Sequence, residues 1–315
     1  MRALLLPLLA LVACDSPISN RMFYEDAEFL AAVPSFVDHP LLVPDTPEAD
    51  TVAHDLPVPG QATDLRAQGA GVADQLTASL ADLAMLADYI RYQEPSLREE
   101  DLRSWGPDSL ENGTRTLLVV DVLRSGLGQY DWAYQLSDSS RGPWEDFYTG
   151  THFAGATVAA GDGNLTADLG VLAAHLGEDR EGVVRCTYDL REGTGFDIGL
   201  EGFRETAGQA PLDAHYRYQR DPDGAGDFQY GFDVDLVTGA QLERSSVRER
   251  WLTDASLRAD LQVEGGDLGE TAYTLSQCWD AAGVLIYQAD SGGLVEPIGV
   301  SWDCAFSKPE YAEPW

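Results

Sequence analysis

The sequence predicts a mainly β protein whose helices precede the sheet (an α+β class). Three observations predict it: an apolar repeat with helical spacing over residues 71–93, a change to period-two alternation from Thr114 onward, and Gly-rich turns at intervals of 10 to 14 residues. We expect a large curved antiparallel meander, a half-barrel or barrel, with the long amphipathic helix packed on its concave face. A two-sheet sandwich is the alternative.

The long helix is predicted by apolar residues that recur at steps of three and four. They are Val72, Leu76, Leu80, Leu83, Ala87 and Ile90. Pro95 is expected to end this segment. Ser96 and Glu99 then fit a capping box and predict a second short helix that ends near residues 105–107. A further short helix is expected at 24–33.

The strands are predicted by alternation of apolar and polar residues, which is typical of antiparallel sheets with one buried and one solvent-exposed face. The run 116–120 begins the series, and the segment 173–176 is expected to be a brief helix. The clearest hairpin turns at 221–226. On the following strand Arg244 and Arg248 are expected to oppose Asp residues across strands. About twelve strands are predicted in all.

The N-terminus has the features of an export signal. Arg2 precedes an apolar run, residues 3–12, which is shorter than the roughly 20 residues that span a bilayer as a helix. Leu11-Val12-Ala13-Cys14 resembles the lipobox of bacterial lipoproteins. The resemblance implies cleavage before Cys14 and acylation of Cys14, so that the mature chain is anchored in a membrane by lipid. An ordinary secretory signal with a coincidental cysteine is the alternative.

This interpretation divides the chain into five parts. They are a cleaved signal at 1–13, a lipidated Cys14 with a Pro- and Asp-rich tether at 14–68, a helical segment at 69–106, an antiparallel β domain at 112–306 and a tail at 307–315. The expected location is the cell envelope of a Gram-negative bacterium, on the inner or the outer membrane.

The charge of the chain limits its partners. It has 53 acidic against 20 basic residues and a net charge of −33. Nucleic acid and anionic membrane surfaces are therefore not expected as partners. Contact with a membrane is expected through the lipid anchor alone, and a hydrophobic ligand or an unidentified protein remains open as a further partner.

Three cysteines remain when Cys14 serves as the anchor. Cys186 lies on the apolar face of a predicted strand, so we expect a buried free thiol. Cys278 and Cys304 flank the last strand region, and we predict a disulfide between them, as an oxidising compartment permits. This bridge would contribute about 3 kcal/mol.

Two wider resemblances concern the mature chain. The expected architecture resembles, at the level of fold, the half-barrel of periplasmic lipoprotein carriers, which hold acyl chains. The segments Trp105-Gly106-Pro107, 265–269, Cys278-Trp279-Asp280 and Cys304-Ala305-Phe306 resemble uncharacterised exported lipoproteins of the myxobacterial kind. That resemblance implies a fold and an exported, membrane-anchored location, and it implies no activity.

Asp290-Ser291-Gly292-Gly293 resembles the nucleophile loop of trypsin-like serine hydrolases, and His175 and Ser301 lie in segments similar to that family's. Ala289 stands where the family has its oxyanion-hole glycine, and only nine residues separate Ser291 from Ser301. A triad also needs a base and an orienting acid within hydrogen-bond reach. We therefore expect Ser291 to lie in a turn and assign no catalytic residue; a serine hydrolase is a remote alternative.

Asp221, Asp223 and Asp227 resemble part of a calcium loop, but no Glu stands at the twelfth position. Asp, Pro and Gly also suit a hairpin turn, which is the favoured interpretation. The histidines have no zinc spacing, and we expect no metal or other cofactor.

A set of aromatic residues could either line an apolar ligand cavity or pack the core beneath the long helix. The set consists of Tyr130, Trp132, Tyr134, Tyr216, Tyr218, Phe228, Tyr230 and Phe232. The sequence thus favours an exported, lipid-anchored protein with a non-enzymatic binding or structural role. The alternative is a periplasmic carrier of a lipid or another hydrophobic ligand.

Overall fold

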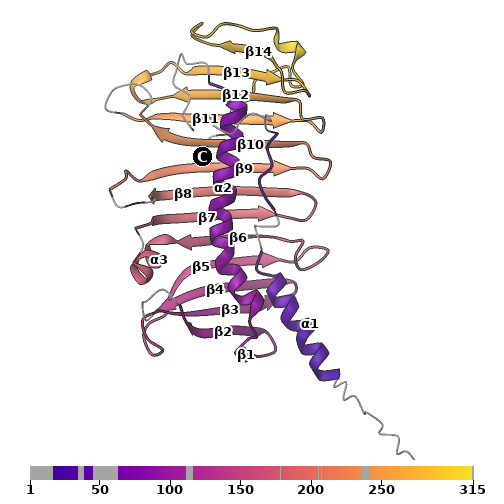
Figure 1. Ribbon diagram of the computed structural model, residues 1–315, viewed down its shortest axis with the longest axis vertical. Coiled ribbons are helices and arrows are strands. Elements are labelled where there is room, and N and C mark those ends of the chain that lie inside the picture. The colour runs from indigo at the N-terminus through magenta and orange to yellow at the C-terminus, as the bar shows by residue number, and fades with distance from the viewer. Residues whose placement is uncertain are drawn as a thin grey trace, which may run out of the picture.

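One antiparallel sheet dominates the computed structural model (Figure 1). The structure describes residues 17–34, 39–44, 63–110, 116–177, 179–204, 206, 208–235 and 241–313. The sheet has 14 strands in sequence order, each paired with the next. They are β1 (Leu97–Arg98), β2 (Leu102–Ser109), β3 (Leu117–Gly126), β4 (Gln129–Ser137), β5 (Glu145–Phe153), β6 (Asp162–Asp168), β7 (Glu181–Asp189), β8 (Thr194–Arg204), β9 (Leu212–Arg220), β10 (Gly226–Val234), β11 (Glu243–Trp251), β12 (Leu257–Glu264), β13 (Tyr273–Trp279) and β14 (Leu285–Asp290).

The predicted antiparallel meander is confirmed, but the predicted half-barrel or barrel is wrong. The sheet is a single layer that is neither closed nor strongly curled, so the two-sheet alternative is also wrong (Figure 1). Large open sheets usually curl in order to cover their apolar face. Here helices cover that face from outside, and the other face is polar, so burial does not require closure.

Helix α2 (Leu65–Asp88) crosses the strands and begins over β11 and β12 (Figure 1). The short 3-10 helix η2 (Tyr89–Tyr92) continues it. The predicted helix at 71–93 is thus confirmed, although it begins six residues earlier. The side chains of 81–88, including Leu83 and Ala87, lie outside the described residues. The buried side chains of Leu76 and Leu80 face the sheet, as their spacing predicts.

Helix α1 (Pro17–Ala31) contains most of the predicted helix at 24–33. It packs at the β1 end of the sheet. Phe29 is fully buried, and its ring meets that of Tyr130 edge-on at 5.7 Å between centroids. Asp26 accepts a hydrogen bond from Arg103 Nε at 2.6 Å and another from Arg98 Nε at 2.9 Å. These contacts fix α1 against the first strands.

The second short helix predicted from Ser96 and Glu99 is wrong. This segment forms the hairpin of β1 and β2, in which the backbone N–H of Ser96 donates to the carbonyl of Ser104 at 2.8 Å. The indole of Trp105 is fully buried in the core. Burial of this ring and pairing with β3 outweigh the local capping signal, because tertiary contacts override weak helix preferences.

The predicted helix at 173–176 belongs to α3 (Leu169–Leu176), which Asp168 caps by accepting from the N–H groups of Gly170 and Val171. The turns η3 (Gly266–Leu268) and η4 (Ser301–Asp303) are short 3-10 helices. The described sheet has two strands more than the roughly twelve predicted. One of these two is the edge strand β1, which lies in the segment that the capping pattern predicted to be helical.

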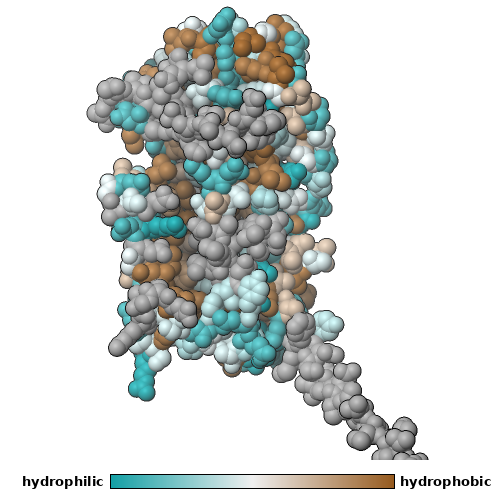
Figure 2. All heavy atoms as spheres, in the orientation of Figure 1, coloured by the Kyte–Doolittle hydropathy of each residue, from teal (hydrophilic) through white to brown (hydrophobic). Residues whose placement is uncertain are grey.

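The two faces of the sheet have opposite character. The face beneath the helices is apolar and will be called the covered face (Figure 2 shows apolar residues gathered beside the helical layer). The opposite face carries Asp, Arg, Thr and Asn side chains and will be called the exposed face. This division follows directly from the period-two alternation in the strands.

Candidate functional site: a polar groove on the exposed face

A groove of about 780 Å³ lies on the exposed face over β5 to β9, near the ends joined by the β7–β8 and β9–β10 turns. Its volume lies within the range of small-molecule sites. Two rows of cross-strand neighbours line it. The first row is Phe153, Asp162, Asp189, Gly195 and Gln219. The second row begins at Asn164 and continues through Thr187, Asp197 and Arg217.

Gly195 lowers the floor of the groove in the middle of the first row. A Cβ at this position would lie 3.5 Å from the carbonyl oxygen of Asp189, which is ordinary van der Waals contact. The backbone of Gly195 is therefore not crowded. The missing side chain leaves room between Asp189 and Gln219, its neighbours on the adjoining strands.

Paired charges occupy both ends of the groove. Arg191 on the β7–β8 turn lies 2.7 Å from Asp189 and 3.4 Å from Asp162. Arg217 Nε donates to Asp197 at 3.0 Å, and Asp197 also lies 2.7 Å from His215 Nε2. The hydrogen bond from Arg191 lowers the pKa of Asp189, which keeps this carboxylate ionised at neutral pH.

Phe153 stands on the rim of the groove, at the start of the first row. Its side chain is 42% exposed, whereas the aromatic side chains on the covered face are nearly all buried. An exposed ring beside ordered polar groups offers an apolar surface on which a ligand can stack.

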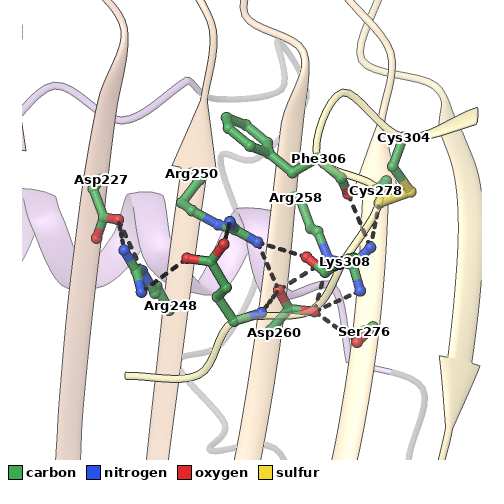
Figure 3. A network of polar contacts seen from close by, with 11 residues as sticks. Asp227, Arg248, Arg250, Arg258, Asp260, Ser276, Cys278, Cys304, Phe306 and Lys308 are labelled. Carbon is green, nitrogen blue, oxygen red and sulfur yellow. Dashed lines mark hydrogen bonds and ion pairs between the residues drawn. A yellow bond between two sulfur atoms is a disulfide. The ribbon is translucent and has the colours of Figure 1, made fainter. Parts of the chain in front are cut away.

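The C-terminal strap, residues 305–313, crosses the exposed face next to the groove. It begins at the disulfide between Cys278 and Cys304 (Figure 3). Arg258 Nη1 donates to the carbonyl of Phe306 at 3.0 Å, and Arg250 Nη2 donates to that of Lys308 at 2.9 Å. The strap thus covers the exposed face of β11 and β12.

Further along, Glu310 lies 2.7 Å from Arg250. The last described residue, Glu313, donates its backbone N–H to Gln229 Oε1 at 2.9 Å and forms an ion pair with Arg217. The strap therefore reaches β9, where Glu313 pairs with a guanidinium group that also lines the groove.

Asp260 organises the buried polar network beneath the strap (Figure 3). This fully buried carboxylate accepts from Arg258 Nε at 2.9 Å and from Ser276 Oγ at 2.6 Å. It also accepts from the backbone N–H of Glu310 at 3.1 Å. The charge is thus fully hydrogen-bonded, which is the condition for burying a carboxylate in a stable fold.

The structure bears out the predicted disulfide and the buried thiol. Cys278 and Cys304 are bonded across a sequence separation of 26, and Cys186 is a buried free cysteine. Burial raises the pKa of the Cys186 thiol, which makes it unreactive. Cys14 lies outside the described residues. Within the described ranges, none of the helices combines the length and the apolar character needed to cross a bilayer.

The possible calcium ligands are not brought together. Asp227 pairs with Arg248 at 2.6 Å, which also confirms the predicted opposition of Arg and Asp rows. Asp223 accepts from the N–H of Ala225, and the Asp221 N–H donates to the carbonyl of Ala225, as in a hairpin turn. In the part of the chain that the structure describes, no cluster of three or more His, Cys, Asp or Glu residues could hold a metal.

The serine and histidine of the trypsin-like resemblance also lie apart. Ser291 Oγ follows β14 and accepts from the N–H of Thr274 at 3.0 Å. His175 lies on α3 and faces Asp138 at 2.9 Å and Glu145 at 3.5 Å. β5 and β14 are separated by nine inter-strand steps, about 43 Å. Asp290 accepts from N–H groups of its own turn, and Ser301 lies in η4.

The predicted aromatic set lies on the covered face. All of its members are buried except Tyr216, which is half-buried. Their rings pack against one another, for example Tyr218 and Phe228 at 6.1 Å and Phe228 and Tyr230 at 5.1 Å between centroids. This packing belongs to the contiguous core, which favours the core interpretation over a cavity.

The groove was not singled out from the sequence. Its residues lie on five strands, β5 to β9, and in their turns. Along each strand they alternate with core residues, as solvent-facing residues do in any sheet with one buried face. The available signals were Gly195 and Phe153, each of which departs from the polar pattern of its row. Their proximity depends on register across β5 to β8, which local periodicity does not specify.

The chain is thus a single-layer antiparallel β protein, with helices on one face of its sheet and a polar groove on the other. Comparison of the chain with family models, with curated proteins and with solved structures gives no match.

Proposed function

We propose that this chain is an exported, lipid-anchored binding protein that acts without catalysis and uses the groove on its exposed face. The observation that carries the proposal is the placement of this groove on a sheet whose strands follow one another in order away from α1 (Figure 1). Pro17, the first residue of α1, follows the lipobox cysteine Cys14 by three positions.

The arrangement gives the anchor a mechanical consequence. α1 is held at the β1 end by Asp26 and Phe29, so lipid on Cys14 would attach the membrane at that end of the sheet. Thirteen inter-strand steps separate β1 from β14, about 60 Å. The groove begins at β5, four steps or about 19 Å from β1, so it would lie beyond the surface of the bilayer.

Two features agree with an exported protein that binds a ligand. The disulfide between Cys278 and Cys304 suits an oxidising compartment. The groove holds ordered and paired polar side chains without a nucleophile-and-base pair, so it supports recognition rather than chemistry. A carrier that holds a hydrophobic ligand under α2 is less well supported, because the aromatic rings there already pack against one another.

The anchor is tested by expression of the full chain in a Gram-negative host, followed by mass spectrometry of the N-terminal peptide. We expect cleavage before Cys14 and acyl chains on Cys14, and Cys14→Ser should leave the protein unprocessed or unlipidated. Cys186→Ser is the matched control and should keep the lipid. An unmodified Cys14 in the wild-type protein would refute the anchor.

The orientation is tested by energy transfer from a dye on the protein to an acceptor in the headgroups of vesicles that carry the lipidated chain. Leu127, in the β3–β4 turn, and Leu294, after β14, are both exposed. On a Cys186→Ala background, a dye at Leu127→Cys should be strongly quenched, and one at Leu294→Cys should not. Equal quenching at the two sites would contradict the proposed geometry. Native mass spectrometry that detects a stoichiometric co-purified lipid would favour the carrier instead.

A further inference from the structure

We infer that the groove over β5 to β9 is a site for an uncharged saccharide. This inference rests on the proposed binding function and names the chemical class of its ligand. Three features of the groove support this inference: its charge balance, its mixture of donors and acceptors, and the exposed ring on its rim.

The charge balance disfavours an anionic ligand. Asp162, Asp189, Glu192, Asp197 and Asp221 contribute five carboxylates to the lining, against the three guanidinium groups of Arg191, Arg217 and Arg220. The whole chain carries −33. Both the local and the overall fields therefore repel phosphate, sulfate and uronate groups.

The pairing of these charges also disfavours a simple cation. The carboxylates of Asp162 and Asp189 face Arg191, and that of Asp197 faces Arg217 and His215. A bound cation would have to displace these guanidinium partners. No cluster of acidic side chains within the described residues is arranged to coordinate a metal.

Hydrogen-bond donors and acceptors lie on neighbouring strands of the groove, and this mixture suits hydroxyl groups. Each hydroxyl both donates and accepts, so it needs a carboxylate or carbonyl on one side and an N–H or O–H group on the other. Asp189 and Asp197 accept, Arg217 and Gln219 donate, and Thr187 can do both. Ion pairs hold the side chains of Asp189, Asp197 and Arg217, which lowers the conformational entropy that these three lose on binding.

Phe153 and Gly195 supply the complementary shape. The exposed Phe153 ring lies at one end of the row and can stack on the C–H face of a sugar ring. Beyond Asp162 and Asp189, the row reaches Gly195, where the missing side chain leaves depth. At about 780 Å³ the groove can hold a short oligosaccharide rather than a single polar ion.

Calorimetric titration of the purified full chain in detergent tests the inference. The neutral probes are chitotetraose, maltohexaose and xylohexaose, and the charged probes are hexagalacturonate (anionic) and the deacetylated chitosan tetramer (cationic). We expect at least one neutral probe to bind with a dissociation constant between about 1 μM and 1 mM, and each charged probe to bind at least tenfold more weakly. If no neutral probe binds, or if a charged probe binds more tightly, the assignment of the groove to an uncharged saccharide is overturned.

Gly195→Thr provides a matched variant, because it adds a side chain at the floor of the groove. We expect it to weaken binding at least tenfold. Gly199→Thr is the control: Gly199 lies on the same strand and the same face, outside the groove, and a Cβ there meets nothing within 4 Å. Both variants should melt at the wild-type temperature. Equal binding by wild type, Gly195→Thr and Gly199→Thr would place the saccharide elsewhere and refute this site.

Phe153→Leu tests the stacking role separately, because it keeps an apolar side chain and removes the aromatic ring. Binding should weaken severalfold, and unchanged affinity would contradict the stacking role. The Cys14→Ser chain should bind as wild type does. A failure of saccharide binding is thus separable from a failure of the lipid anchor, which is measured by mass spectrometry.

Discussion

The carboxylate of Glu249 lies directly beneath Gly69 of α2, so close that a Cβ on Gly69 would stand 1.8 Å from Glu249 Oε1. Glu249 is fully buried on the covered face of β11. The Tyr230 hydroxyl lies 3.4 Å from the same oxygen. A glycine in the helix thus permits an acid to lie between helix and sheet.

Gly69→Ala should destabilise the protein by about 1–3 kcal/mol, the usual cost of overpacking a filled core. In an exposed helix the same change stabilises by roughly 1 kcal/mol, so the expected sign is reversed here. The free energy of unfolding by denaturant measures the effect. The double variant Gly69→Ala/Glu249→Ala provides the control, because shortening Glu249 makes room for the methyl group. If Gly69→Ala is neutral or stabilising, the close approach is not present.

Glu249 should make stability depend on pH. Burial raises the pKa of its carboxyl well above the ordinary value, so the folded protein holds a proton that the unfolded chain releases. The contribution of Glu249 to the free energy of unfolding is fully present below the pKa of the unfolded chain, near 4.3. It is lost as the pH rises from there toward the pKa of the folded protein. The slope cannot exceed about 1.4 kcal/mol per pH unit for one proton.

Glu249→Gln should therefore flatten the decline of unfolding free energy that begins near pH 5, just above the ordinary glutamate pKa. Glu264→Gln serves as the control, because Glu264 is an exposed residue on neighbouring β12. It should leave the profile as in wild type. Parallel profiles for wild type and Glu249→Gln would show that Glu249 does not titrate in this way.

Asp260→Asn should be strongly destabilising, by about 3–5 kcal/mol, because it leaves the buried guanidinium of Arg258 without its charged partner. Asp233→Asn is a matched change in a half-exposed pair with Arg244, at 3.1 Å, and should cost less than about 1 kcal/mol. Chemical denaturation of both variants gives the comparison. Similar small losses would mean that the network beneath the strap is open to water.

Reduction of the disulfide, or Cys304→Ser, should release the C-terminal strap. The bridge closes a separation of 26 residues, and its loss should cost about 3 kcal/mol. Amide hydrogen exchange should quicken first at residues 305–313 and only later in the central strands. The Cys186→Ala variant should respond to reductant as wild type does. Unchanged protection of the strap after reduction would show that the ion pairs alone hold it.

Local patterns predicted the elements well where a single periodicity dominated. The spacing from Val72 to Ile90 predicted α2, and the alternation around Tyr216 and Phe228 predicted the β9–β10 hairpin. The Ser96 and Glu99 pattern failed because it described only a local preference. Trp105, a few residues further on, is buried in the core, and that tertiary contact selects a strand.

The candidate site could not be predicted from local patterns. Phe153, Gly195 and Arg217 are far apart in sequence and line one groove only through the register of successive strands. The aromatic set illustrates the same point, because the sequence left cavity and core both open and the placement of α2 favours the core.

Local sequence patterns were enough to predict the antiparallel meander, the long helix, the disulfide and the buried thiol, because side-chain alternation is repeated along each element. Three features became apparent from the folded chain alone: the sheet stays open, Glu249 lies under Gly69, and the strap reaches Arg217 beside the groove. The reason is physical: curvature, burial of charge and the shape of a site depend on which residues distant in sequence meet across strands, and periodicity carries no information on such pairs.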